Sequence, residues 1–430
     1  MNIPDLYQLF CEHPVITTDT RDCTPGAIFF ALKGASFDGN AFAQNALDAG
    51  CAYAVVDDEH VSGDERLIHV PDVLQTLQDL AAWHRRQLRT PIVQVTGTNG
   101  KTTTKELVSA VLGERFNVLF TQGNFNNHIG VPKTLLRLKK EHDIAVIETG
   151  ANHPGEIALL SRIVDADCGL ITNVGKAHLE GFGSFEGVVR TKGELYDFLR
   201  EKEGAFVFLH GDNQNLTEIA KGLKTVTYGE PGKGYDVEGE VISCTPFLNM
   251  RWRVAGGEWQ NVQTHLIGSY NVYNALAAAA VGTHFGVAPS EVSHALGKYE
   301  PTNNRSELKK TAHNTLIIDA YNANPTSMKA ALDNFRLISH PRKIAILGEM
   351  RELGFASADE HRKVVEEAEA AGDCDIWLVG RNFEPYAGSH RYFPDVEAVK
   401  AVLQTQPVEG GLILIKGSNG TRLYQLPECL

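Results

Sequence analysis

The chain of 430 residues is 43% hydrophobic and 22% charged, and its formal net charge is −13. A chain of this length holds about three domains of ordinary size, and the composition is that of a folded globular protein. The acidic balance argues against a general nucleic-acid binder, and the lack of a long apolar run argues against insertion into a membrane.

The cysteines give no sign of a disulfide framework or a zinc site. There are seven, they lie far apart, and no two form a Cys-x-x-Cys pair. Residues 1–12 also lack the basic segment and long apolar run of a secretory signal. The sequence therefore predicts a cytoplasmic protein.

The first part of the chain predicts a small α/β unit. Strands are expected at 27–32 and 53–56, with a helix at 41–49 between them. A second helical segment covers 73–88 and leads towards Pro91. We expect this unit to form a first domain, residues 1–83.

The middle of the chain, residues 84–301, predicts a mostly parallel sheet covered by helices. Short apolar runs alternate there with helix-like segments, which is typical of such sheets. The expected strands are 92–96, 118–121, 144–149, 169–174 and 205–209. Residues 225–267 differ, because their short strands and glycine turns predict antiparallel pairing, and an alanine-rich helix follows at 270–285.

The last block, residues 302–430, again predicts a doubly wound, Rossmann-like domain. Its expected strands are 316–320, 343–347, 375–379 and 411–415, and its helices include 325–335 and 359–371. The whole chain is therefore predicted to be an α/β protein of three domains.

The most informative motif is a glycine-rich turn that joins the strand at 92–96 to a helical run at 103–112. In a phosphate-binding loop, backbone N–H groups surround the phosphates, a lysine reaches the outer ones and a threonine hydroxyl binds Mg²⁺. This loop is a variant, because Val95 occupies the position of the first glycine. The alternative is a glycine turn with an incidental lysine. The residues of the loop are Gly97, Thr98, Asn99, Gly100, Lys101, Thr102 and Thr103.

Polar residues also lie at or just after the ends of two later strands of the predicted central sheet. Glu148 ends the strand at 144–149, where a second contact to Mg²⁺ is expected; the alternative is a glutamate that faces solvent. His178 follows the strand at 169–174 and either binds a metal or an anionic intermediate or is a polar surface group. Lys192 enters a helix and, on chemistry alone, has the pattern of an ordinary solvated lysine.

Together these motifs resemble the Mur ligases, ATP-dependent amide-forming enzymes of peptidoglycan synthesis. The resemblance rests on residues 97–104, Glu148, 173–178 and 192–194, and it extends over essentially the whole chain. Three further segments resemble the D-alanyl-D-alanine-adding branch of the family: 123–132, 319–328 and 347–354. No Asp-Asn-Pro-Arg run, typical of the diaminopimelate-adding branch, occurs.

The resemblance implies one domain for each substrate. The segments 19–21, 29–34 and 37–40 resemble the UDP-sugar-binding domain of the family, so the first domain would bind the UDP-sugar-peptide. The central domain would bind ATP, and the C-terminal domain would bind the amine substrate. Two positions depart from the family pattern: Asn40 stands where histidine is expected, and Thr20 where serine is common.

The resemblance also implies roles for single residues. Lys192 matches the lysine that these ligases carbamylate with CO₂, which turns a cation into an anion that binds Mg²⁺. Thr102 and Glu148 would hold one Mg²⁺, and His178 and carbamylated Lys192 a second. The remaining implied positions are Lys101 and Arg305 at the ATP phosphates, Asn271 near the adenine, Asn322 and Asn324 over the nucleotide, and, for the substrates, Thr20, Arg21, Lys33, Asp38, Asn40, Asn126, Asn127 and Lys416.

The implied substrates are UDP-N-acetylmuramoyl-tripeptide and D-alanyl-D-alanine, joined through an acyl phosphate by a monomeric enzyme. One alternative is another amide ligase of the same superfamily, such as a folylpolyglutamate synthase. Alternatives of other classes are an ATP-driven switch that does not ligate and a regulatory relative that has lost catalysis. The first domain and the run from Asn322 to Pro325 favour the muramyl substrate. The third residue of the peptide, lysine or diaminopimelate, stays open.

Overall fold

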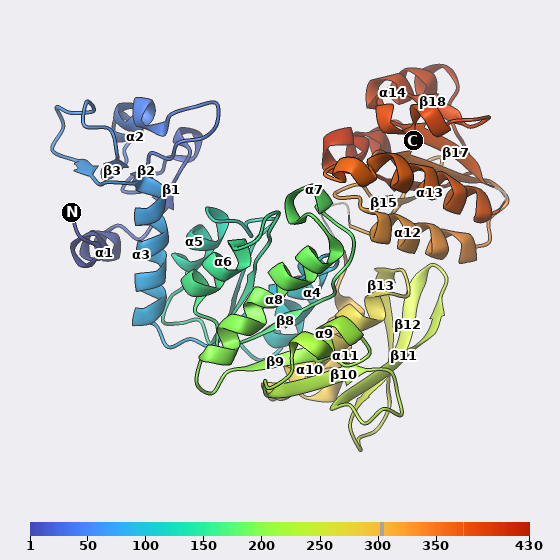
Figure 1. The fold of residues 1–430 in the computed structure, drawn as a ribbon, viewed down its shortest axis with the longest axis horizontal. Coiled ribbons are helices and arrows are strands. Elements are labelled where there is room, and N and C mark those ends of the chain that lie inside the picture. Colours follow the sequence, from blue (N-terminus) through green and yellow to red (C-terminus); the bar gives the residue numbers. More distant parts are fainter. Residues whose placement is uncertain (302–304, 373) are drawn as a thin grey trace.

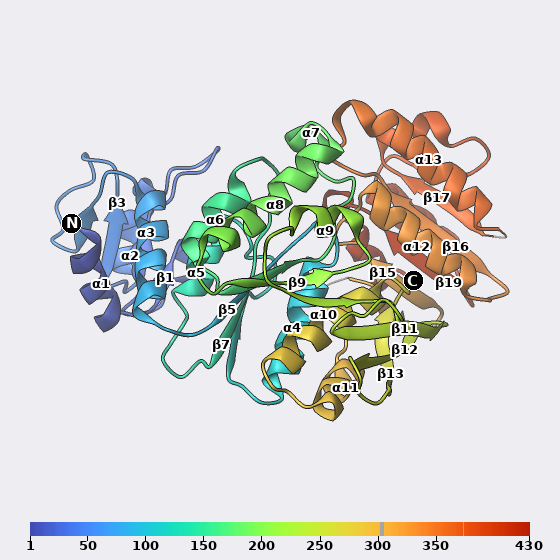
Figure 2. The ribbon, with the colours of Figure 1, turned by 60° about the horizontal axis from the view of Figure 1, so that its bottom comes forward.

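The computed structural model describes residues 1–301, 305–372 and 374–430 (Figure 1). Its strands form three sheets that follow one another along the chain. Figures 1 and 2 show the N-terminal sheet at one end, the largest sheet in the middle and the C-terminal sheet at the far end. The predicted α/β fold with three domains is confirmed.

The N-terminal sheet has the order β1-β2-β3-β4, and all its strands are parallel. Its strands are β1 (Ile16–Thr17), β2 (Ile28–Phe30), β3 (Tyr53–Val56) and β4 (Leu67–His69), and its helices are α1 (Ile3–Glu12), α2 (Ala43–Asp48) and α3 (Val73–Gln87). The Asp72 carboxylate caps α3 by accepting from the Gln75 N–H. The predicted domain boundary at residue 83 falls inside α3, which packs on α1 and also on two helices of the middle domain.

The middle sheet has the order β13-β12-β11-β10-β9-β8-β5-β7-β6. Its strands are β5 (Ile92–Thr96), β6 (Val118–Phe120), β7 (Ile144–Glu148), β8 (Cys168–Ile171), β9 (Phe206–His210), β10 (Thr225–Gly229), β11 (Val237–Cys244), β12 (Phe247–Val254) and β13 (Gln260–Ile267). Its helices are α4 (Lys101–Gly113), α5 (Gly130–Leu135), α6 (Glu156–Val164), α7 (Leu179–Phe182), α8 (Phe185–Glu201), α9 (Gln214–Ile219), α10 (Asn271–His284) and α11 (Pro289–Lys298).

The prediction for residues 225–267 is correct in part. Strands β11 to β13 pair in antiparallel fashion, as expected, but they are long rather than short. Strand β10 is parallel to both β9 and β11, so the predicted antiparallel pairing is wrong there. The connection that carries α9 returns the chain to the same end of the sheet before β10 begins, which makes β10 parallel to β9, and the end of β10 then pairs with the start of β11 through Tyr228 and Val237.

The C-terminal sheet has the order β14-β15-β19-β16-β17-β18, and it is parallel except for β14. Its strands are β14 (Glu307–Lys310), β15 (Thr315–Asp319), β16 (Lys343–Gly348), β17 (Asp375–Val379), β18 (Arg391–Phe393) and β19 (Leu412–Lys416), and its helices are α12 (Pro325–Leu337), α13 (Ser357–Ala370) and α14 (Val396–Thr405). The predicted start of this domain, Thr302, lies outside the described residues.

The position of β5 explains where a ligand site can form. In the middle sheet β5 lies between β8 and β7, so the chain order reverses at this strand. Helix α4 leaves β5 on one face of the sheet and packs on α10, and α6 and α8 pack together beside β8. Crevices in open α/β sheets form at the carboxyl ends of the strands where the order reverses.

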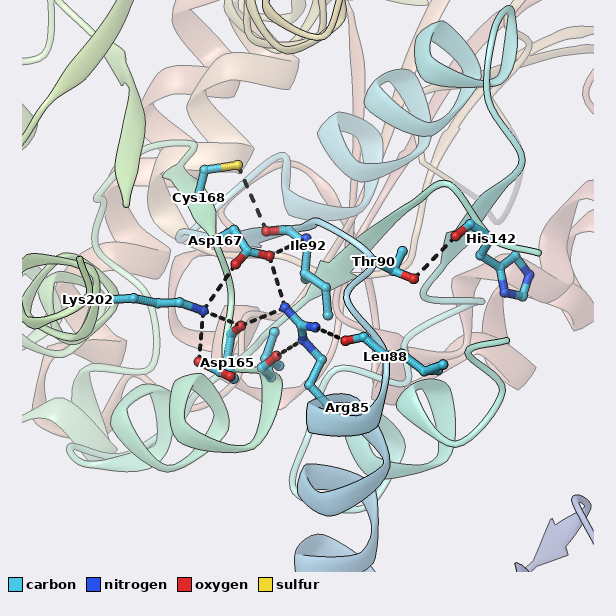
Figure 3. A network of polar contacts seen from close by, with 10 residues as sticks. Arg85, Leu88, Thr90, Ile92, His142, Asp165, Asp167, Cys168 and Lys202 are labelled. Atoms are coloured by element: carbon cyan, nitrogen blue, oxygen red, sulfur yellow. Dashed lines mark hydrogen bonds and ion pairs between the residues drawn. The ribbon is translucent and has the colours of Figure 1, made fainter. Parts of the chain in front are cut away.

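The buried guanidinium of Arg85 on α3 is connected through hydrogen bonds to the first residue of β5 (Figure 3). Arg85 is 4% exposed and donates to the backbone oxygens of Val164, Leu88 and Asp165 at 3.2, 2.8 and 3.1 Å. It also donates to Asp167 Oδ2 at 2.9 Å, and the same oxygen accepts from the Ile92 N–H at 2.9 Å. The network therefore holds the first residue of β5 against the neighbouring helices.

Candidate active site

A cavity of about 550 Å³ lies between the middle and C-terminal domains. Its walls come from the loop after β5, the end of β7, the start of α10 and the segment that joins β15 to α12. Residues from distant parts of the sequence therefore meet in one place, at the carboxyl edge of the middle sheet. The predicted site residues that line this cavity are Thr98, Asn99, Gly100, Lys101, Thr102, Thr103, Asn126, Asn127, Glu148, His178, Asn271, Arg305, Asn322 and Lys416.

The loop after β5 has the backbone shape of a phosphate-binding loop. Gly97 and Gly100 have φ angles of +142° and +77°, which other residues adopt only with strain. A Cβ at Gly97 would also lie 2.0 Å from the Thr172 hydroxyl oxygen. Gly100 directly precedes α4, so the N–H groups of the first helical turn lie at the cavity wall. The predicted order of strand, glycine turn and helix is confirmed.

The Lys101 ammonium lies over this loop. Its Nζ donates to the backbone oxygens of Gly97 and Thr98, both at 2.9 Å. Burial lowers the pKa of Lys101 to about 8; Glu148 opposes this shift and Arg305 adds to it. An anion in the cavity would favour the charged form of this lysine.

Glu148 fits the chemistry of a magnesium ligand. Its side chain is fully buried, and Oε1 accepts from Thr102 Oγ1 at 3.2 Å and from Asn126 Nδ2 at 2.7 Å. Its second oxygen, Oε2, is buried without a hydrogen-bond partner among the described residues. A carboxylate oxygen beside a threonine hydroxyl is a donor set that Mg²⁺ accepts, so the residues present fit this ion.

Lys192 lies on α8 but is not solvated. Only 2% of it is exposed, and its Nζ donates to the Ala151 backbone oxygen at 3.3 Å. The Nζ atom also lies 5.2 Å from the centre of the Phe182 ring. Burial, and next the charge of Lys101, lowers the pKa of Lys192 to about 7. The interpretation of Lys192 as a solvated helix lysine, made on chemistry alone, is therefore wrong, because the loop at Ala151 and the Phe182 ring lie against its ammonium.

His178 and Glu352 connect the middle and C-terminal domains. His178 has a φ of +49° and directly precedes α7, and its Nδ1 contacts the Glu352 carboxylate. Burial lowers the pKa of His178, and Glu352 acts against that shift. An ion pair between the domains joins Lys176 to Glu360 at 3.1 Å.

Two asparagines make a further contact between the domains. Asn324 Nδ2 donates to Asn99 Oδ1 at 2.7 Å, and Asn99 Nδ2 donates back to Asn324 Oδ1 at 3.4 Å. The same Asn324 oxygen caps α12 by accepting from the Ser327 N–H. The phosphate-binding loop thus contacts the C-terminal domain directly.

The C-terminal domain contributes two cations to the cavity. The Arg305 guanidinium lies 3.9 Å from the centre of the Tyr321 ring, which is a stacking distance. Lys416, at the end of β19, is 2% exposed, pairs with Asp319 at 2.9 Å and donates to the Asn322 backbone oxygen at 2.6 Å. Among the described residues, Lys416 thus has a carboxylate partner for its charge, whereas Arg305 forms no ion pair.

The residues predicted to bind the UDP-sugar do not line this cavity. Thr20 and Arg21 lie in a short helical turn, η1 (Thr20–Asp22), where the guanidinium pairs with Asp19. Lys33 pairs with Asp57 at 2.9 Å. The Asn40 amide is buried and donates to both Asp38 and Asp57 at 2.8 Å, so this asparagine joins two loops of the N-terminal sheet. Their predicted contact with a UDP-sugar stays a prediction.

Several residues that line the cavity were not predicted from the sequence. Tyr321 and Asp319 lie inside a segment whose motif was recognised, but neither was singled out as a site residue. Asn274 lies one helical turn after Asn271, and its spacing on α10 is a signal that places both side chains on one face. Glu352, which lies outside this cavity, belongs to the segment 347–354 identified from sequence, but its contact with His178 has no local signal because His178 belongs to another domain.

Two absences concern the part of the chain that the structure describes. No group of three or more histidine, cysteine, aspartate or glutamate side chains there is placed to hold a metal ion. The predicted Mg²⁺ ligands include a hydroxyl and a modified lysine, so this finding does not test them. Within the same residues, no helix is both long and apolar enough to cross a bilayer.

The sequence matches known families along most of its length. Residues 95–282 match the Mur ligase middle domain, 304–419 the Mur ligase glutamate ligase domain, and 14–85 the catalytic domain of the Mur ligase family. Together with the three sheets and the phosphate-binding loop, these matches show that the chain belongs to the Mur ligase family.

Individual relatives point to one branch of that family. The UDP-N-acetylmuramoyl-tripeptide--D-alanyl-D-alanine ligase of Bacillus subtilis is 36% identical, with 96% of this chain and 92% of that protein covered. The crystal structure of MurF from Acinetobacter baumannii superimposes with a TM-score of 0.85 at 32% identity, over 96% of this chain and 92% of that one. The MurF ligase of Thermotoga maritima, solved in complex with ADP, gives a TM-score of 0.83 at 26% identity over 96% of both chains.

Proposed function

We propose that this protein joins D-alanyl-D-alanine to UDP-N-acetylmuramoyl-tripeptide at the cost of one ATP, giving the UDP-pentapeptide, ADP and phosphate. The proposal rests on one observation above all. The phosphate-binding loop, a buried carboxylate with one free oxygen and the cations of the C-terminal domain meet in a single cavity. The full-length similarity to ligases of this name supports the choice of substrates.

The reaction needs an activated acyl group, because a carboxylate does not react with an amine at neutral pH. The terminal carboxylate of the tripeptide attacks the γ-phosphorus of ATP, a P–O bond to ADP breaks, and an acyl phosphate forms. The dipeptide amine then attacks the acyl carbon, phosphate leaves, and the amine loses a proton. Phosphoryl transfer of this kind depends on positioning and on neutralising charge.

The residues of this chain supply both requirements. Lys101 and Arg305 would face the transferred phosphoryl group, and the N–H groups at the start of α4 would hold the other phosphates. Thr102 and Glu148 would hold one Mg²⁺, and His178 and carbamylated Lys192 a second; bound Mg²⁺ neutralises charge on the phosphates. Closure of the two domains would keep water away from the acyl phosphate.

The environment of Lys192 supports carbamylation. A lysine must be neutral to attack CO₂, and it then loses a second proton as the N–C bond forms and the carbamate becomes an anion. A pKa of about 7 leaves a large share of this amine neutral at physiological pH. The positive charge of Lys101 also acts on Lys192, so this buried lysine gains more from becoming an anion than a solvated one would.

Further parts of the proposal follow from the substrates. The N-terminal domain would bind the UDP-sugar through the loops that carry Arg21 and Lys33, and the chain would act as a cytoplasmic monomer. The test is a ligation assay that measures ADP release with UDP-muramoyl-tripeptides carrying lysine or diaminopimelate. We expect ADP release to require both the UDP-peptide and the dipeptide. Release without either acceptor would indicate an ATP-driven switch, and ligation of glutamate to a folate would indicate the other ligase class.

A further inference from the structure

A second cavity, of about 230 Å³, opens between the loop after β8 and the C-terminal domain. It shares His178, Tyr321 and Asn322 with the first cavity, so the two are neighbours that meet at these side chains. Its other walls come from the turns that follow β16 and β19. A small molecule in this cavity would have one end beside the site proposed for acyl activation.

The second cavity contains one strong cation. Among the described residues that line it, Arg351 is the only lysine or arginine. Within the described chain Arg351 forms no ion pair, and its guanidinium donates to the Gly420 backbone oxygen at 3.3 Å. The carboxylate of the next residue, Glu352, contacts His178 instead. Most N–H groups of this guanidinium are therefore available to an anion.

We propose that Arg351 binds the C-terminal carboxylate of the incoming dipeptide, with the dipeptide amine directed towards His178 and Asn322. This inference rests on the function proposed above. A free dipeptide carries a carboxylate that must exchange water for a protein donor when it enters a cavity, and a guanidinium provides paired N–H groups for it. The amine must reach the first cavity, and His178 and Asn322 lie where the cavities meet.

The turn after β19 is shaped around this guanidinium. A Cβ at Gly420 would lie 2.2 Å from Arg351 Cζ, so a larger residue at 420 has to displace the guanidinium. Ser418, which is 4% exposed, donates to the Glu349 backbone oxygen at 2.7 Å and joins the turns that carry Gly420 and Arg351. The position of the Arg351 guanidinium thus depends on Gly420, which lies two residues after the buried Ser418.

The test compares two acceptors and three variants of the full-length protein. The acceptors are D-alanyl-D-alanine and D-alanyl-D-alaninamide, which lacks the carboxylate charge. The variants are Arg351→Met, Gly420→Ala, which keeps the arginine but displaces it, and Arg336→Met, a matched control at an exposed arginine on α12. Each is assayed for kcat and for KM towards all three substrates, with circular dichroism as a check of folding.

For the wild-type protein we expect the amide to have a KM about 10- to 100-fold higher than the dipeptide, the range of one charge-assisted contact. Arg351→Met should raise the KM for the dipeptide by a similar factor, leave the KM for ATP and the UDP-peptide unchanged, and have no further effect with the amide. Gly420→Ala should act in the same direction, and Arg336→Met should behave as wild type.

Two results would overturn the inference while the proposed function stands. One is an unchanged KM for the dipeptide in folded Arg351→Met. The other is an equal loss with the dipeptide and its amide, which would indicate a structural role. If wild-type protein ligates neither acceptor, the proposed function fails and this inference fails with it. If Arg351→Met does not fold, Gly420→Ala alone decides between these outcomes.

Discussion

Proton uptake on ATP binding gives a direct measure of the role of Lys101. The surroundings of this lysine lower its pKa to about 8, with burial as the main cause. A polyphosphate beside the ammonium acts in the opposite direction and raises the pKa again. Binding should therefore draw a proton from the solution, and the affinity for ATP should fall as the pH rises through 8.

The size of this uptake follows from the pKa. At pH 8 about half of the lysine is neutral before ATP binds, and at pH 7 about one tenth, so uptake should be about 0.5 proton per ATP at pH 8 and about 0.1 at pH 7. Calorimetry of ATP binding at pH 8 is repeated in buffers of different ionisation enthalpy. The number of protons taken up is the slope of the observed binding enthalpy against the ionisation enthalpy of the buffer.

Two substitutions distinguish proton uptake by Lys101 from proton uptake by other titrating groups. Lys101→Arg stays charged at all these pH values and should bind ATP without uptake. Lys101→Met should bind ATP weakly, show no uptake and lose at least about a hundredfold in kcat. If wild-type protein takes up no proton at pH 8, or if Lys101→Met takes up as many as wild type, Lys101 does not face the phosphates.

Three further predictions concern other parts of the structure. If Lys192 is carbamylated, activity should fall in CO₂-depleted buffer and return with bicarbonate. Lys192→Ala should lose most activity and regain part of it with acetate. Mass spectrometry of native protein that finds no added CO₂ would contradict the carbamylation of Lys192. Arg85→Met should lower the free energy of unfolding by about 2–4 kcal/mol, because it leaves buried oxygens without donors, whereas exposed Arg86→Met should change it by less than about 0.5 kcal/mol in urea denaturation. Asn324→Ala should cost about 1 kcal/mol of stability through the lost cap of α12 and raise the KM for ATP; an unchanged KM would exclude a role at the nucleotide.

Patterns within a short stretch predicted the centre of the fold well. The strands expected at 53–56, 92–96 and 375–379 have these bounds in the structure, because each is an apolar run with polar or turn residues at its ends. Polar residues at the ends of parallel strands share one edge of the sheet, and for that reason Glu148 and the phosphate-binding loop could be placed together from sequence.

Features that depend on distant parts of the chain could not be predicted in this way. Lys192 is buried with Ala151 and Phe182 at its ammonium, and nothing in the run around residue 192 shows what covers it. The pairing of Glu352 with His178 depends on how two domains meet. The hydrogen bond from the Asn40 amide to Asp57, 17 residues further along the chain, likewise has no signal in the residues around position 40.

The contacts between the middle and C-terminal domains differ in how they respond to the solution. Lys176 and Glu360 form an ion pair that is partly accessible to water, so dissolved salt weakens it. The Asn99–Asn324 pair carries no charge, and each amide is both donor and acceptor. The contact nearest the phosphate-binding loop should thus keep its strength as the ionic strength rises, while the Lys176–Glu360 contact weakens.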